Sequence, residues 1–197
     1  MGTEAALALR LGRESGLLRS RDAVAAGVSR TALSRLVARG DLVWVSRGVY
    51  HMPEGPRPDP IAILCATHPS VVICLTSALA MHALTTQSPR QVWSAIGSKA
   101  AVPRIEYPPL RVVRMNEANL REGVQEKIVD GVTVRVTSPA RTVADCFKFR
   151  SRVGLDVALE ALRSAWESRI VTMDELWQAA GQTRMTNVMR PYLESLV

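Results

Sequence analysis

The chain has 197 residues, of which 47% are hydrophobic, and a formal net charge of +7 from 25 basic and 18 acidic side chains. This is enough apolar material for one substantial core, or for a small domain beside a larger one. The excess of positive charge favours an anionic partner. The three cysteines have no CxxC spacing and lie in apolar surroundings, which indicates buried thiols rather than a zinc or disulfide framework.

The positive charge is concentrated near the N-terminus. Residues 1–52 carry eight arginines and four acidic residues, a net charge of +4, whereas the other 145 residues carry 17 basic and 14 acidic residues, a net charge of +3. Four prolines and Gly55 then crowd into residues 53–60, a composition that sustains neither a helix nor a central strand. We therefore predict a first domain at 1–52, a Pro-rich linker at 53–60 and a second domain at 61–197.

Three helices and a hairpin are predicted in the first domain. Glu4–Glu14 has the apolar stripe of an amphipathic helix. A short helix, Ser20–Ala26, is expected to be capped by Ser20 and to end at Gly27. Ser29 can then cap a third helix, Arg30–Arg39.

Two short strands are expected to follow the third helix. Residues 42–45 and 48–51 are rich in valine and aromatic residues, and they flank the turn-forming segment Ser46-Arg47-Gly48. Helix, tight turn, helix and hairpin in this order predict a winged helix-turn-helix, a DNA-binding arrangement.

The third helix has the residue types that a DNA-recognition helix needs. Leu33, Leu36 and Val37 form an inward face, which leaves small polar and cationic side chains for the major groove. An arginine at the hairpin tip suits a phosphate or a narrow minor groove, and the flanking arginines suit phosphates. The alternative is a merely solvated basic face, but the ordered succession of elements favours DNA binding. The predicted DNA-binding residues are Arg19, Arg21, Ser29, Arg30, Thr31, Ser34, Arg35, Arg39 and Arg47.

The second domain reads as a mixture of strands and helices, so that the predicted fold class is α+β. Asp130-Gly131 is expected to form a tight hairpin turn. Ser138 and Pro139 are expected to open the first of the C-terminal helices. Strands are predicted at 71–75, 92–96, 110–115, 126–129 and 132–136, and helices at 61–67, 76–84, 139–149, 155–168, 173–180 and 186–196.

Catalytic and metal sites are not predicted. Glu126, Lys127 and Asp130 come closest to a nuclease-like cluster, but Glu126 and Lys127 are adjacent and would point to opposite faces of a strand. The phosphate-binding patterns GxxxxGK[ST] and GxGxxG do not occur. We therefore expect no enzyme activity, no metal and no cofactor.

Polar residues in the second domain are given structural roles. Arg141 and Asp145 are expected to form an exposed i,i+4 pair or a network at the start of their helix. His82 is expected to be a packed histidine of the core or of an interface. The most apolar stretch, 71–84, is broken by polar residues, so a soluble, cytoplasmic protein without a membrane contact is expected.

The segment from Ser29 to Tyr50, SRTALSRLVARGDLVWVSRGVY, resembles the N-terminal domain of AbiEi-type antitoxins, whose wing characteristically reads like Arg-Gly-Val-Tyr. Two later segments, Cys74–Leu84 and Thr137–Cys146, are similar to segments that follow in the same family. The resemblance therefore covers most of the chain, with weaker detail between Gln87 and Gln125.

The resemblance implies a two-domain antitoxin of a type IV toxin–antitoxin system, a class connected with phage defence. Such an antitoxin represses its own promoter through the winged domain, and its C-terminal domain is needed to neutralise a nucleotidyltransferase-like toxin encoded beside it. The implied partners are double-stranded promoter DNA with inverted repeats and the cognate toxin, with the protein bound as a dimer or as paired monomers. A stand-alone transcriptional regulator and, below it, a DNA-targeted nuclease are the alternatives.

Overall fold

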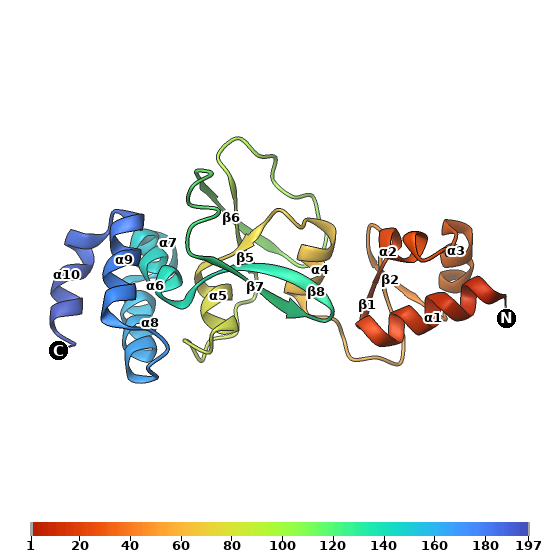
Figure 1. Ribbon diagram of the computed structural model, residues 1–197, viewed down its shortest axis with the longest axis horizontal. Helices are drawn as coiled ribbons and strands as arrows, with labels where there is room; N and C mark the ends of the chain where they lie inside the picture. The colour runs from red at the N-terminus through yellow and green to blue at the C-terminus, as the bar shows by residue number, and fades with distance from the viewer. Residues whose placement is uncertain (1, 197) are drawn as a thin grey trace. The chain divides into compact units, whose positions relative to one another are not determined.

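The structure is a computed structural model that describes residues 2–196 and has an α+β fold (Figure 1). The chain forms two compact units. The first unit contains the chain up to Ser70, together with residues 103–109 and 127–134. The second contains Val71–Val102, Leu110–Glu126 and the chain from Arg135 onward. The units are not continuous in sequence, and the boundaries proposed at 52 and 61 stay a prediction.

The N-terminal part of the first unit combines three helices with a small antiparallel sheet. The strand order in this sheet is β1-β3-β2, and β2 and β3 form a hairpin. The three predicted helices and both hairpin strands are confirmed. β1 was missed, because three residues are too few for a strand to show periodicity. The elements are α1 (Thr3–Ser15), β1 (Leu17–Arg19), α2 (Ser20–Ala25), α3 (Arg30–Ala38), β2 (Val43–Ser46) and β3 (Val49–His51).

The predicted cap of the second helix is wrong. Ser20 is the first residue of α2, and the N-cap position belongs to Arg19, without a side-chain capping bond. Arg19 is held in an extended conformation because it pairs with Val49 in the sheet. The Ser20 amide instead donates a 2.7 Å hydrogen bond to the carbonyl of Gly48, next to the hairpin turn.

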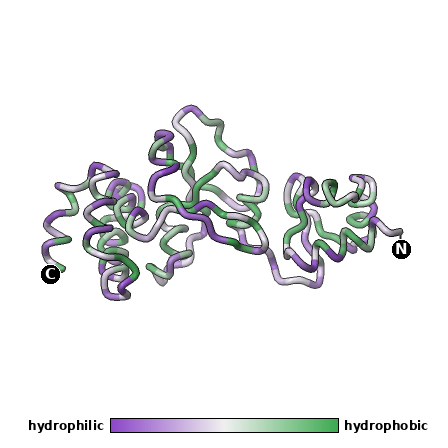
Figure 2. Tube along the Cα trace, in the orientation of Figure 1, coloured by the Kyte–Doolittle hydropathy of each residue, from purple (hydrophilic) through white to green (hydrophobic). Residues whose placement is uncertain are grey.

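One face of each helix in this region is buried. In Figure 2, polar and apolar residues alternate along these helices, as expected for elements with a single buried face. Leu33 and Leu36 of α3 are each only 1% exposed. They belong to a cluster of buried apolar residues that consists of Ala8, Leu9, Leu18, Ala23, Val28, Leu33, Leu36 and Leu42.

A mixed sheet of five strands and a set of C-terminal helices make up most of the remaining chain. The strand order is β6-β5-β4-β8-β7, with β5 parallel to β6, β4 antiparallel to β5 and β4 parallel to β8. The elements are α4 (Pro60–Thr67), β4 (Val72–Ile73), α5 (Leu75–Met81), β5 (Val92–Gly97), β6 (Leu110–Met115), β7 (Val124–Val129), β8 (Val132–Thr137), α6 (Pro139–Lys148), α7 (Arg150–Val153), α8 (Leu155–Glu167), α9 (Met173–Thr183) and α10 (Thr186–Glu194).

The turn between β7 and β8 confirms the predicted tight hairpin. Asp130 and Gly131 have φ angles of 46° and 70°, the left-handed values that a two-residue hairpin turn requires. The predicted helix at 76–84 is shorter in the structure. It ends at Met81 because Ala83 adopts a left-handed φ of 56°. The single turn α7 was missed, and it is too short to show a helical period.

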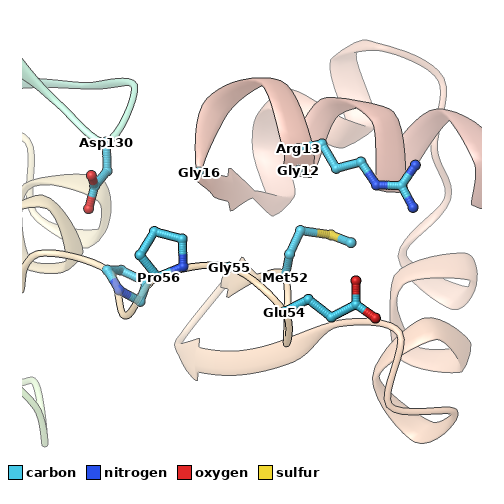
Figure 3. Close-up of a pocket in the computed structure, with 9 residues that line it drawn as sticks. Gly12, Arg13, Gly16, Met52, Glu54, Gly55, Pro56 and Asp130 are labelled. Atoms are coloured by element: carbon cyan, nitrogen blue, oxygen red, sulfur yellow. The ribbon is translucent and has the colours of Figure 1, made fainter.

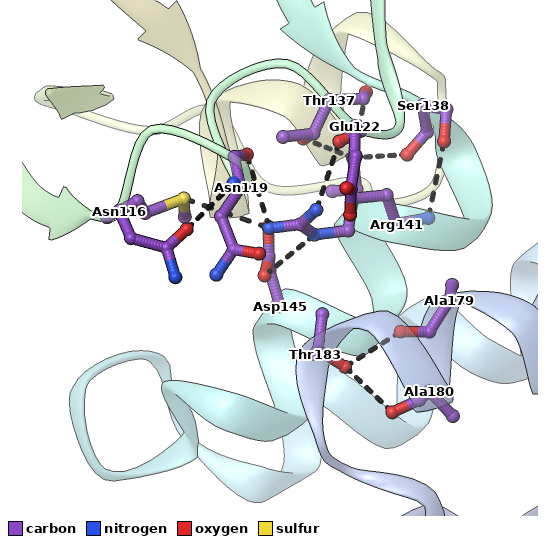
Figure 4. Close-up of polar contacts among 12 residues, drawn as sticks. Asn116, Asn119, Glu122, Thr137, Ser138, Arg141, Asp145, Ala179, Ala180 and Thr183 are labelled. Carbon is purple, nitrogen blue, oxygen red and sulfur yellow. Dashed lines mark hydrogen bonds and ion pairs between the residues drawn. The ribbon is translucent and has the colours of Figure 1, made fainter. Parts of the chain in front are cut away.

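The expectation of an exposed pair at Arg141 and Asp145 is wrong. Their side chains are 1% and 0% exposed, and Arg141 Nε lies 3.1 Å from Asp145 Oδ1 (Figure 4). The reason is that α6 packs against α5, α8 and α9, so residues 140–147 are all buried. An i,i+4 spacing identifies the pair but does not tell how many neighbours surround the helix.

Arg141 also connects α6 to the loop that precedes β7. Its guanidinium donates to the carbonyl oxygens of Glu122, at 3.0 Å, and Asn119, at 3.4 Å. Gly123 has a φ of 62°, and a Cβ atom built there would lie 3.1 Å from Arg141 Cβ. The loop therefore passes close to the helix at a residue without a side chain.

The histidine and cysteines expected to be packed are buried. His82 Nε2 donates to the carbonyl oxygen of Thr137 at 2.7 Å, and its residue is 8% exposed. Burial raises the pKa of the Cys65 thiol to about 12 and raises that of Cys74 well above its ordinary value. The three cysteines are free and buried, as predicted. Among residues 2–196, no helix is both long enough and apolar enough to cross a membrane.

Candidate nucleic-acid interface

Helix α3 is fixed at its N-terminus by two polar side chains. The Ser29 hydroxyl accepts a hydrogen bond from the Ala32 amide at 3.2 Å, so the predicted cap is confirmed. Glu4 of α1 accepts hydrogen bonds from the Ser29 hydroxyl, at 2.6 Å, and from the Ser29 amide, at 3.0 Å. These bonds, first of all the one from the hydroxyl, lower the pKa of Glu4 below its ordinary value. The first turn of α3 is thus tied to α1.

The face of α3 opposite its buried leucines is polar and cationic. Arg30, Thr31, Ser34 and Arg35 are all exposed. The helix contains two arginines and no acidic residue. In the described part of the chain, neither arginine has a hydrogen bond or an ion pair. Their guanidinium groups are therefore available to an anionic partner.

Three of the predicted arginines already have a carboxylate neighbour. Arg39, which follows α3, lies 2.9 Å from Asp41. Arg19 pairs closely with Asp22, and Arg21 lies 3.6 Å from the same carboxylate. Surface pairs of this kind are weak, so a phosphate can replace the carboxylate partner at small cost. These three arginines are therefore less available to an anionic partner than Arg30 and Arg35 of α3.

Arg47 lies at the turn of the β2–β3 hairpin and is exposed. Gly48 beside it has a left-handed φ of 70°, which closes the turn. The Gly48 carbonyl accepts the Ser20 amide, so the turn is held to the start of α2. The structure thus supports the hairpin tip by a fixed contact with the helical part of the unit.

The hairpin also carries an exposed aromatic residue that the sequence analysis treated only as part of a strand. Trp44 is 53% exposed and pairs across the hairpin with Tyr50, which is half-buried. Val43 beside Trp44 is also exposed, whereas Ser46 at the end of β2 is buried, so the open part of the strand is its first half. The signal available in the sequence was a tryptophan beside the predicted turn.

The first unit also contains a cavity of about 250 Å³ (Figure 3). Its charged residues, Arg13, Glu54 and Asp130, carry both signs, and Met52 lines it between α1 and the segment after β3. The rest of the lining consists of glycines and prolines. Among these lining residues there is no pairing of a nucleophile with a base.

The residues predicted to come closest to a nuclease-like cluster, Glu126, Lys127 and Asp130, do not form a metal-binding group. Asp130 is part of the hairpin turn, and its carboxylate accepts a 2.7 Å hydrogen bond from the Asp59 amide. Glu126 is exposed and Lys127 is half-buried, both on β7. Over residues 2–196, no group of three or more His, Cys, Asp or Glu side chains is arranged to hold a metal ion.

Comparison with protein families assigns the N-terminal segment. A family model described as "Transcriptional regulator, AbiEi antitoxin" matches residues 6–53. These residues are AbiEi-like. The resemblance expected from the α3 and hairpin sequence is confirmed over this segment, which contains most of α1 and all of α2, α3 and both hairpin strands. The two later segments of the expected resemblance lie beyond the match.

A solved structure resembles most of the chain. The crystal structure of the RV2827C protein from Mycobacterium tuberculosis superposes with a TM-score of 0.61 at 14% sequence identity. The similarity covers 92% of this chain and 72% of the other. At this identity the similarity shows the fold. No functionally curated protein matches the sequence.

Proposed function

We propose that residues 1–52 form a winged helix-turn-helix that binds double-stranded DNA. The observation that carries the proposal is the exposed face of α3, where two arginines without a hydrogen bond or ion pair in the described chain lie beside Thr31 and Ser34. Helix α2, the turn at Gly27, helix α3 and the hairpin succeed one another in the order of this motif. The match to a family of transcriptional regulators supports the same function.

In this arrangement the side chains of α3 read base edges. Arg30 and Arg35 can each donate two hydrogen bonds to a guanine, and Thr31 and Ser34 can contact bases or phosphates. Arg47 binds a phosphate or enters a narrow minor groove. Arg19, Arg21 and Arg39 bind flanking phosphates in exchange for their carboxylate partners.

Ser29 acts on the helix rather than directly on DNA in this proposal. Its hydroxyl already accepts from Ala32 and donates to Glu4, so it has little capacity left for a phosphate. The serine sets the start of α3 and thereby the position of Arg30 and Thr31. Its proposed role is to position the residues that contact DNA.

The full proposal is an antitoxin that represses its own promoter and neutralises a nucleotidyltransferase-like toxin encoded beside it. Binding as a dimer or as paired monomers on an inverted repeat would place one α3 in each of two successive major grooves. The protein would act in the cytoplasm, without a cofactor and without catalysis. The family match at residues 6–53 is the support for this role.

A reporter assay tests the regulatory part. The DNA upstream of the gene is fused to a reporter, and the chain is supplied in trans as the native form, as Arg35→Ala or as Arg13→Ala. Arg13 is an exposed arginine of α1 and serves as the control for loss of one charge. Repression by the native form and by Arg13→Ala, but not by Arg35→Ala, is expected. Equal repression by all three would contradict the role of α3.

A growth assay tests the antitoxin part. The neighbouring nucleotidyltransferase-like gene is expressed with and without this chain. Toxicity that the native chain relieves is expected. A neighbour that is not toxic, or toxicity that the chain leaves unchanged, would support the stand-alone regulator in its place.

A further inference from the structure

The second unit contains an open cavity of about 310 Å³ at the edge of its sheet. It lies where α5, the segment before β5 and the edge strand β6 come together. Its volume falls within the lower part of the range that small-molecule sites occupy. The lining residues are Thr76, Gln87, Pro89, Arg90, Gln91, Trp93 and Arg111.

Arg111 is held in place by two contacts. It is the direct neighbour of Trp93 across the parallel strands β5 and β6, and its guanidinium carbon lies 5.2 Å from the centroid of the Trp93 ring. Its Nε donates a 2.8 Å hydrogen bond to Gln91 Oε1. The cation–π contact with tryptophan and the bond through Nε restrain the guanidinium and leave its terminal nitrogens to other partners.

The terminal nitrogens of Arg111 have no hydrogen-bond partner among the described residues. A second arginine on the same strand behaves differently. Arg114 donates from Nη1 to the carbonyl oxygens of Gly97, Ser98 and Ala100, so one of its terminal nitrogens is already used within the protein. A place on β6 therefore does not by itself leave an arginine without protein partners. Arg111 is held through Nε, while its terminal nitrogens have no hydrogen-bond partner among the described residues.

The rest of the cavity matches an anionic ligand with an organic part. Arg90 adds a second positive charge, and the lining contains no acidic residue. Gln87 and Thr76 supply further polar groups, while Pro89 and Trp93 supply apolar surface. A guanidinium held in one plane binds phosphate through two parallel hydrogen bonds.

We propose that this cavity is a binding site for a small organic phosphate, with Arg111 as the principal phosphate ligand and Arg90 as the second. The volume accommodates an organic group of about nucleoside or sugar size beside the phosphate. The site lies in the second unit and is independent of the DNA-binding proposal for the first.

Calorimetric titration of the full chain tests the site. The ligands are the four ribonucleoside 5′-monophosphates, glucose 6-phosphate, the corresponding nucleosides and glucose, and inorganic phosphate. At least one organic phosphate is expected to bind one-to-one with a Kd below about 1 mM, and more tightly than its phosphate-free counterpart and inorganic phosphate. Failure of every organic phosphate to bind in this range would overturn the proposal.

Variants of the full chain locate the binding. Arg111→Gln is expected to weaken it at least about tenfold, which corresponds to loss of one charge-assisted contact. Arg111→Lys keeps the charge but loses the planar pair of guanidinium donors, so it is also expected to weaken ligand binding. Arg163→Gln, at an exposed arginine of α8, is the matched control and should bind like the native chain.

Arg35→Ala separates this site from the proposed DNA interface, and it should leave the binding of the phosphate ligand unchanged. Thermal unfolding by circular dichroism confirms that each variant is folded. If Arg35→Ala abolished binding while both Arg111 variants retained it, the ligand would be bound by the first unit, and the proposed site would be refuted.

Discussion

Helices α3 and α6 begin in the same way and use their arginines differently. Each starts after a serine whose hydroxyl accepts the amide three residues later, Ala32 in one helix and Arg141 in the other. In α6, Arg141 is 1% exposed and ion-paired with Asp145. In α3, Arg35 is exposed and has no ion pair among the described residues. An arginine is structural where the fold supplies a buried carboxylate, and it is open to a ligand where the fold does not.

The largest effect is expected at the buried pair. Arg141→Met leaves Asp145 in the core without its countercharge and removes the contacts to Asn119 and Glu122. Burial already raises the pKa of Asp145 above its ordinary value, and the Arg141 charge opposes that rise. The free energy of unfolding of the full chain should fall by about 3–5 kcal/mol, measured by urea denaturation.

The matched control for this prediction is Arg163→Met on the exposed side of α8, which should change the free energy of unfolding by less than about 0.5 kcal/mol. Similar small losses for both variants would mean that the Arg141–Asp145 pair contributes little, and the comparison with α3 would lose its basis.

The next effect is expected at α3 and on binding alone. Arg35→Ala should weaken binding to the correct operator by about 1–3 kcal/mol and relax the preference for one base pair if Arg35 reads a base. Its free energy of unfolding should stay close to that of the native chain, because Arg35 has no hydrogen bond or ion pair in the described structure and its attraction to the Glu4 carboxylate acts between exposed groups. Anisotropy titrations on operators with single base-pair changes measure the loss of affinity and the change in base-pair preference. Urea denaturation, as for Arg141→Met, measures the free energy of unfolding. An equal loss on every sequence would assign Arg35 to a phosphate.

The hairpin tip is expected to act through charge rather than sequence. Arg47→Ala should weaken binding to all duplexes by a similar factor and should reduce the slope of log K against log salt by about 1, since one phosphate contact is lost. Titrations at several salt concentrations give the slope. An unchanged slope would show that Arg47 does not touch the backbone.

The smallest effect concerns the polar contact that fixes α3. Ser29→Ala removes the cap, which should lower the free energy of unfolding by about 1 kcal/mol. It also removes the hydroxyl bond to Glu4, which should raise the pKa of Glu4 toward its ordinary value. Because the folded-state pKa of Glu4 is lowered, its contribution to stability is present above the unfolded-state pKa and is lost as pH falls through the folded-state pKa. NMR titration of the Glu4 carboxyl carbon in both proteins measures the shift. An identical pKa in the two proteins would contradict this contact.

The elements that sequence predicts well are those whose signal is local. The Ser29 cap, the Asp130-Gly131 turn and the four longer strands of the five-stranded sheet follow from short patterns of capping, turn and strand residues, and the structure contains them. The α3 face follows in the same way, because burial of Leu33 and Leu36 determines which side chains point outward.

The features that sequence missed depend on distant neighbours. Burial of Arg141 and Asp145 requires three other helices around α6. The displacement of the α2 cap requires pairing of Arg19 with Val49, and the hydrogen bond from Ser29 to Glu4 joins residues 25 positions apart. The cation–π contact of Arg111 with Trp93 likewise needs the register of β5 and β6. None of these follows from the spacing of residue types within one element.

Specific DNA binding by the first unit has a direct test. A gel-shift titration compares the chain on DNA from its own upstream region with the chain on a shuffled duplex at the same physiological salt concentration. We expect a preference of about 10³-fold or more for the upstream DNA. Equal weak binding to both duplexes, lost as salt rises, would contradict it and leave the basic N-terminal unit as a non-specific anchor.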